Sequence, residues 1–250
     1  MVIKLNKKVV KILVVISLGL SISFTVGMSA IGKNFYNKNK KPIYSVNRQD
    51  KKISISFDCA WGVDYTQELL DIMEVYKVKS TFFMVEFWAE KYPEYVKKID
   101  QMGHEIGTHS CTHKYMSKLS RQEIQDELTK SSATIESVIG KKVKLFRPPY
   151  GDYNNLLLEV ASSLNLKTIQ WSIDTLDWKD YSANKIAEKV IKKAKSGAII
   201  LCHNNGLHTA EALPKIFEVL ISQGYSFVPI SELVYQENYY IDINGIQRLN

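Results

Sequence analysis

The sequence predicts an α/β fold in which strands and helices alternate around a mainly parallel sheet. Short runs rich in β-branched and aromatic residues recur from Lys51 onward, and segments with apolar residues at helical spacing separate them. A length of 250 residues with 45% hydrophobic residues is enough for one domain of roughly 200 residues and an extension. We therefore expect a single folded α/β domain.

Seven strands are expected in this domain. They cover residues 53–57, 80–85, 105–107, 143–146, 167–171, 198–202 and 226–228. The longest helical segment has clear limits, because Ser120 with Glu123 three residues later forms a capping box and Gly140 supplies a stop. Ser182 and Gly197 bracket a second helix, and a third ends at Gly224.

The N-terminus carries a different pattern. Four lysines within the first eleven residues precede an apolar run, residues 12–31, that contains no charge and is about as long as a bilayer-spanning helix. We interpret residues 1–31 as an uncleaved signal-anchor in preference to a cleaved signal, and residues 32–50, rich in Lys and Asn, as a solvated linker. Residues 51–236 form the domain and 237–250 a C-terminal tail. We expect a single-pass membrane protein with an extracytoplasmic domain, or a secreted protein.

The formal net charge of +7 is unevenly distributed. Residues 1–49 hold nine of the 33 Lys and Arg residues and no acidic residue, which leaves 24 basic and 26 acidic residues in the remainder. A nucleic-acid-binding domain needs a basic footprint of its own, so no nucleic-acid partner is expected. The three cysteines are an odd number and do not indicate a disulfide framework.

Polar residues that could take part in catalysis or bind a metal follow the predicted strands. Two imidazoles four residues apart, His109 and His113, are the ligand type that zinc-like cations prefer. In β/α barrels the loops at the carboxyl ends of the strands build the active site. The residues that follow a predicted strand in this way are Asp58, His109, His113, Arg147, Asp174, Asp177 and His203. The sequence therefore predicts that these side chains meet at one mouth.

With these residues placed, the chain from about residue 51 to 235 resembles the polysaccharide deacetylases that share a NodB homology domain. Four of the five motifs of that family are matched, as His109-Ser110-Cys111-Thr112-His113, Arg147-Pro148-Pro149-Tyr150-Gly151, Asp174-Thr175-Leu176-Asp177-Trp178 and Leu201-Cys202-His203. The resemblance implies a distorted, seven-stranded (β/α) barrel related to the TIM barrel.

The resemblance also implies a reaction, the metal-dependent removal of N-acetyl groups from an amino-sugar glycan of the peptidoglycan or chitooligosaccharide type. His109 and His113 would hold a divalent metal, zinc in the first instance and cobalt or another ion as alternatives. Asp58 would be the general base, with Arg147 as its ion partner, and His203 the general acid, oriented by Asp177. The backbone N–H of Tyr150 would bind the oxyanion. Trp178 would stack on a sugar or serve only in packing.

The first motif departs from the family pattern. Its second aspartate, normally a metal ligand, is replaced in Ser56-Phe57-Asp58-Cys59-Ala60-Trp61-Gly62, a variant similar to that of sporulation-associated relatives. Cys59 could bind as a thiolate, or Asp64 or water could supply the missing oxygen ligand. The third alternative is a weak or absent metal, which would make the chain a catalytically impaired glycan-binding or spore-envelope protein. A nucleic-acid or protein-interaction module is disfavoured.

Overall fold

The computed structural model describes residues 40–250. Its strands are β1 (Ser45–Val46), β2 (Lys52–Cys59), β3 (Thr81–Met84), β4 (Glu105–Thr108), β5 (Leu145–Phe146), β6 (Lys167–Thr168), β7 (Ile173–Asp174), β8 (Ile199–His203), β9 (Ser226–Phe227), β10 (Tyr239–Ile241) and β11 (Ile246–Leu249). Its helices are α2 (Thr66–Val75), α3 (Glu86–Lys91), α4 (Pro93–Gln101), α5 (Arg121–Ile139), α6 (Asn155–Ser163), α7 (Ala183–Lys193), α8 (Thr209–Ser222) and α9 (Ile230–Leu233). Three short 3₁₀ turns are η1 (Met116–Lys118), η2 (Pro149–Gly151) and η3 (Asp177–Lys179).

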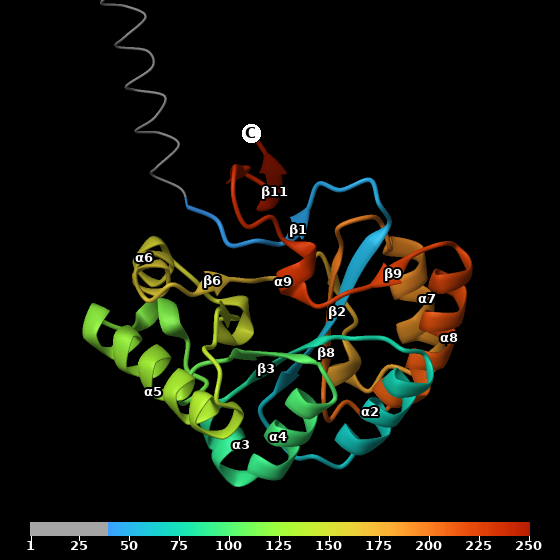
Figure 1. The fold of residues 1–250 in the computed structure, drawn as a ribbon, viewed down its shortest axis with the longest axis horizontal. Coiled ribbons are helices and arrows are strands. Elements are labelled where there is room, and N and C mark those ends of the chain that lie inside the picture. The colour runs from blue at the N-terminus through green and yellow to red at the C-terminus, as the bar shows by residue number, and fades with distance from the viewer. Residues whose placement is uncertain (1–39) are drawn as a thin grey trace, which may run out of the picture. The chain divides into compact units, whose positions relative to one another are not determined.

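The main sheet is parallel and curved, and helices lie around its outer side (Figure 1). The strand order is β6-β5-β4-β3-β2-β8-β7, and β9 pairs with the start of β2. The strands β6 and β7 at its two ends are not paired with each other. Backbone bridges join Ile43 to Ile169, which follows β6, and Ser45 to Ala198, which precedes β8. The predicted α/β fold is confirmed as a distorted, open β/α barrel.

Alternation along the strands separates two cores. In β2, Ile53, Ile55, Phe57 and Cys59 face the helices and join the larger hydrophobic cluster. A smaller cluster fills the barrel interior next to the site, and it contains Ile43, Val46, Phe83, Leu145, Ile169, Ile199, Ile230, Leu233 and Val234. The polar residues of the strands therefore stand above an apolar base.

The predicted elements are largely found. Each of the seven expected strands overlaps an observed strand, and helix α5 has the capping box of Ser120 and Glu123 and a left-handed Gly140 at its end. No predicted element covers β1, β7, β10, β11, α3, α6 or α9. The missed strands have two to four residues, too few for a periodic pattern to stand out.

The segment expected as the end of a solvated linker is part of the fold. Ile43 and Val46 are almost completely buried, and Val46 N–H donates to the carbonyl of Gly197 at 2.9 Å. The predicted C-terminal tail is also ordered, because β10 and β11 form an antiparallel pair and β11 pairs in parallel with β1. The domain thus begins before residue 51 and extends beyond residue 236.

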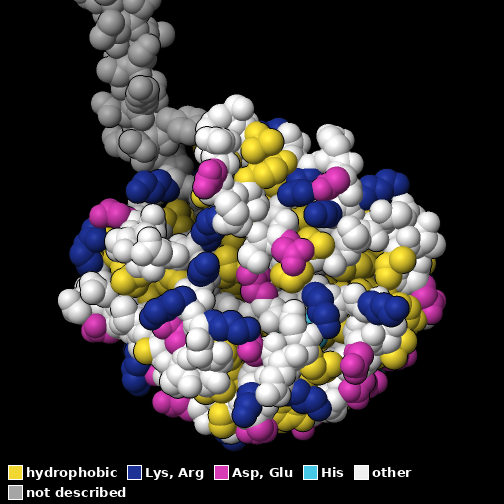
Figure 2. Space-filling view, in the orientation of Figure 1, with side chains coloured by type: hydrophobic (Ala, Val, Ile, Leu, Met, Phe, Trp, Pro, Cys, Tyr) yellow, Lys and Arg dark blue, Asp and Glu magenta, His cyan; other side chains and the backbone are white. Residues whose placement is uncertain are grey.

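The predicted signal-anchor, residues 1–31, lies outside the described residues. Within residues 40–250 no helix has the length and apolar character needed to span a bilayer. Over the face seen in Figure 2, basic and acidic side chains are interspersed rather than separated into regions of one sign. This mixture agrees with the near-equal numbers of the two types after residue 49.

Candidate functional site

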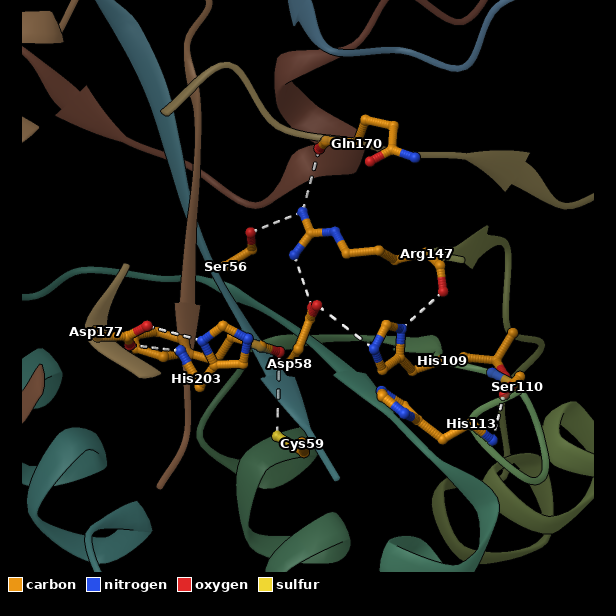
Figure 3. A network of polar contacts seen from close by, with 12 residues as sticks. Ser56, Asp58, Cys59, His109, Ser110, His113, Arg147, Gln170, Asp177 and His203 are labelled. Atoms are coloured by element: carbon orange, nitrogen blue, oxygen red, sulfur yellow. Dashed lines mark hydrogen bonds and ion pairs between the residues drawn. The ribbon is translucent and has the colours of Figure 1, made fainter. Parts of the chain in front are cut away.

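A buried ion pair forms the floor of the mouth. Asp58, at the end of β2, accepts a hydrogen bond from Nη1 of Arg147 at 2.8 Å, and the arginine is completely buried (Figure 3). Nη2 of Arg147 donates to the hydroxyl of Ser56 at 2.9 Å and to the carbonyl of Gln170 at 3.3 Å. Burial opposes ionisation of Asp58, but the guanidinium outweighs it and lowers the pKa of the carboxyl. Asp58 is therefore a carboxylate at neutral pH.

A second pair stands beside it on the neighbouring strand. His203, at the end of β8, is the register partner of Asp58. Its Nδ1 lies 2.7 Å from Oδ1 of Asp177, whose Oδ2 accepts from the backbone N–H of His203 and the hydroxyl of Thr209, both at 2.7 Å. Burial lowers the pKa of His203, but the hydrogen bond and charge of Asp177 prevail and raise it above its ordinary value. Asp177 thus favours the protonated form of His203, which can donate a proton.

His109 and His113 lie on the other side of Asp58 (Figure 3). Nδ1 of His109 lies 2.7 Å from the carbonyl of Arg147, which can only accept, so Nδ1 carries the proton. Nε2 of His109 then turns a lone pair toward Oδ2 of Asp58 at 3.5 Å. The rings of His109 and His113 are 5.0 Å apart, and burial lowers the pKa of both, that of His113 to about 4.

These two imidazoles fit two positions of a cation's ligand shell. Both are neutral, the free lone pair of His109 faces a carboxylate, and the buried Nδ1 of His113 has no hydrogen-bonding partner among the described residues. Within residues 40–250, no group of three or more His, Cys, Asp or Glu side chains has a geometry that would hold a metal. The donor set is therefore that of a two-histidine site.

The structure does not bring the two alternative ligands to the histidines. Cys59 is completely buried in the outer core, with its thiol directed at the carbonyl of Phe57, and burial raises the pKa of that thiol well above its ordinary value. Asp64 is exposed and accepts a hydrogen bond from Asn205 at 3.0 Å. The expectation of a third protein ligand from Cys59 or Asp64 is therefore not met. The reason is that Cys59 alternates with Asp58 along β2 and points to the opposite face.

The mouth opens into a cavity of about 610 Å³. Asp58, His109, His113 and His203 line it together with four aromatic side chains: Trp61, Tyr150, Trp171 and Trp178. Three of these rings are more than half exposed. Tyr150 has a positive φ of 58° inside η2, a strained backbone of the kind found at functional sites. The structure thus brings Tyr150 and Trp178 to the same mouth as the polar residues.

Sequence reasoning gave no role to several residues that shape the site. Ser56 lies two positions before Asp58 on the same face of β2, so strand alternation was a usable signal. Asn204 donates to the carbonyl of Gly62 and the hydroxyl of Thr66, both at 3.0 Å, and thereby ties the end of β8 to the loop after β2. No periodic pattern identifies that contact, because its partners are 142 and 138 residues apart.

Comparison with known proteins decides the family. Residues 45–169 match the family described as polysaccharide deacetylase. A peptidoglycan-N-acetylglucosamine deacetylase of Bacillus cereus is 36% identical over 196 residues, which cover 76% of this chain and 92% of the relative. The chain belongs to the polysaccharide deacetylase family. The resemblance predicted from the motifs is thereby confirmed.

Other polysaccharide deacetylase relatives differ in what is known of them. YlxY of Bacillus subtilis, described as uncharacterised, is 34% identical over 78% of this chain, and the match spans 60% of YlxY's own length. A crystal structure from Bacillus anthracis, described as a CE4 family pseudoenzyme, has a TM-score of 0.75 and 34% identity, and covers 78% of this chain and 69% of that one. A mutant of the same protein is described as having restored enzymatic activity.

Proposed function

We propose that the chain hydrolyses the N-acetyl group of an amino sugar in a peptidoglycan-type glycan. The observation that supports this most directly is the pair of oppositely tuned groups on adjacent strands, a carboxylate at Asp58 and a proton donor at His203. Amide hydrolysis needs a base for water and an acid for the leaving nitrogen, and this site places both beside one cavity.

The residues divide the reaction between them. Asp58, kept ionised by Arg147, takes a proton from the attacking water as its oxygen adds to the acetamide carbon. The backbone N–H of Tyr150 binds the oxyanion. His203, kept charged by Asp177, protonates the nitrogen as the C–N bond breaks, so that acetate and a free amine leave. When held by His109 and His113, a zinc-like ion supplies Lewis-acid polarisation of the carbonyl.

The aromatic lining supports a saccharide as the substrate. Trp61, Tyr150 and Trp178 present large exposed rings at the rim, and exposed aromatic groups gathered around a cavity are a common feature of binding sites. The B. cereus relative acts, by its name, on peptidoglycan N-acetylglucosamine. We propose the same class of polymer for this chain.

A second candidate is a glycan-binding protein that does not hydrolyse its ligand. The missing third protein ligand favours it, as does the likeness to a structure described as a pseudoenzyme. Both candidates share the scaffold and the saccharide. They differ in metal content and acetate release.

The place of action is also a proposal. The charge-flanked apolar run at residues 12–31 supports a membrane anchor with the domain outside the cytoplasm, where peptidoglycan lies. Protease treatment of intact cells tests this, because an extracytoplasmic domain is digested while cytoplasmic proteins survive.

The deciding experiment measures acetate released from peptidoglycan and from acetylated chitooligosaccharides, with Zn²⁺, Co²⁺ or chelator present. The hydrolase predicts release that is lost in Asp58→Asn and retained in the matched control Asp64→Asn, whose exposed side chain is not part of the cavity lining. Glycan binding without acetate release under every metal condition would establish the second candidate.

A further inference from the structure

A carboxylate holds the histidine loop, residues 109–113, from behind. Glu127 of α5 is buried, and its Oε2 accepts hydrogen bonds from the backbone N–H groups of Cys111 at 2.9 Å and Thr112 at 2.8 Å. Its Oε1 accepts the hydroxyl of Thr112. Among residues 40–250, Glu127 forms no ion pair with a lysine or arginine, and the hydrogen bonds to its carboxylate all come from this loop.

The loop needs such support because its backbone is strained. Ser110 and His113 have positive φ values of 74° and 57°, and a side chain in that region costs about 1–2 kcal/mol per residue. Inside the loop, the hydroxyl of Ser110 accepts from the backbone N–H of His113 at 3.0 Å (Figure 3). A single internal bond of this kind is worth about 1 kcal/mol, which is less than the strain of the two residues.

Glu86, at the start of α3, holds the same loop from a second direction. Its backbone N–H donates to the carbonyl of Ser110 at 3.0 Å, and its carboxylate accepts the thiol of Cys111 and the hydroxyl of Thr134. Burial opposes ionisation of Glu86, but the hydrogen bonds from Cys111 and Thr134, with that of Lys130, lower its pKa overall. The carboxylates of Glu127 and Glu86 therefore both bind the loop, and neither of them lines the cavity.

We propose that Glu127 is a positioning residue that keeps His109 and His113 facing Asp58. It acts through hydrogen bonds to the loop backbone, and its consequence for catalysis rests on the function proposed above. The hydrogen-bond geometry allows the shape of the Glu127 side chain to be tested separately from its charge. A glutamine offers an amide oxygen to the two N–H groups and an amide nitrogen to the Thr112 hydroxyl, so it retains the contacts without the charge.

The test compares Glu127→Gln, Glu127→Ala and the control Asp126→Ala in the full chain. Asp126 is the preceding residue of α5 and is exposed. Hydrogen exchange, followed by mass spectrometry over residues 109–114, reports the loop directly. We expect exchange to rise about tenfold in Glu127→Ala, because the N–H groups of Cys111 and Thr112 both lose their acceptor, and to stay within about twofold of wild type in the other two variants. Labelling of His113 by diethyl pyrocarbonate should rise in parallel.

Unchanged exchange and labelling in Glu127→Ala, or an equal rise in Glu127→Gln, would overturn the proposal. If Glu127→Ala does not fold, Thr112→Val removes the hydroxyl contact alone and should give a smaller rise over the same residues. Neither readout requires catalysis, so a wild-type chain that releases no acetate would refute the proposed hydrolase and leave this inference standing. If the chain is active, acetate release should fall in Glu127→Ala and recover in Glu127→Gln.

Discussion

At the scale of single residues, the site depends on charges removed from water. Arg147 is completely buried, with its guanidinium 4.2 Å from the ring centre of Phe83 and paired with Asp58. Such a charge is tolerated only when its partner and hydrogen bonds replace the lost hydration. The same requirement applies to Asp177, which is fully buried and accepts from His203 and Thr209.

Replacing Arg147 by methionine should therefore lower the free energy of unfolding by about 3–5 kcal/mol at pH 7, since Asp58 is left buried and unpaired. The depressed pKa of Asp58 stabilises the wild type above the carboxyl's ordinary pKa, and this contribution is lost as pH falls through the folded-state value. The defect should consequently shrink in acid. Urea titrations at pH 7 and in acid measure this difference in the free energy of unfolding. Arg121→Met is the control, because its pair with Glu159 is half exposed and should cost less than about 1 kcal/mol. Equal effects of the two variants would contradict the argument.

Asp177→Asn should lower the pKa of His203, because burial then acts on the imidazole without an opposing carboxylate. An acid with a lower pKa loses its proton earlier as pH rises. The alkaline limb of kcat/KM for acetate release should move to lower pH, and an NMR titration of His203 should show the same direction. Asp180→Asn, at an exposed residue that also lines the cavity, should leave both curves in place. An unchanged His203 titration in Asp177→Asn would refute the assigned cause.

At the scale of elements, the ends of parallel strands carry the site residues, and the short segment of residues 43–46 completes the barrel. Asp58 and His203 end β2 and β8, the histidine loop follows β4, and Arg147 follows β5. Residues 43–46 lie between β6 and β8, where Ile43 bridges to Ile169 and Ser45 to Ala198. Residues 43–46, which precede the first predicted strand, thus fill the gap where the two ends of the sheet do not pair.

Gly197 tests how closely that segment fits. A Cβ at this glycine would lie 1.7 Å from the carbonyl oxygen of Val46, and its φ of 80° is itself unfavourable for alanine. Gly140 has a φ of 68° but open space around it. Thermal or urea unfolding should show a loss of about 1–2 kcal/mol for Gly140→Ala from backbone strain alone. Gly197→Ala should lose clearly more, because residues 43–46 must also move. Equal losses would mean that the segment is not held against the barrel.

At the scale of the whole molecule, a substitution at position 59 tests whether metal binding can be coupled to folding. The wild type presents two imidazoles, and its third candidate ligand is a thiol in the core. A ligand that binds only the folded state stabilises it by about 2.7 kcal/mol at 100 times its Kd. A carboxylate at position 59 would have to leave the core to reach the histidines. A metal bound by all three side chains would stabilise that conformation.

We therefore expect Cys59→Asp to destabilise the metal-free chain by about 3 kcal/mol or more, as a carboxylate buried without a partner does. Added Zn²⁺ should restore much of that loss. Cys202→Asp is the matched control, since Cys202 is equally buried in the same core but lies on β8 beside Phe57. It should be destabilised without recovery. Melting curves with Zn²⁺ or chelator decide, and equal recovery in both variants would contradict the prediction.

The sequence by itself determined the order of the seven predicted strands, the limits of α5 and the motif residues that meet at the mouth. These features depend on local periodicity, capping chemistry and motifs in which the reacting residues lie within a few positions of each other. Only the tertiary structure decided that Cys59 and Asp64 stay away from the histidines, that residues 43–46 lie in the barrel gap, and that Glu127 holds the histidine loop. Each of these depends on which side of a strand or helix faces a partner distant in sequence, and packing of the whole domain sets that choice.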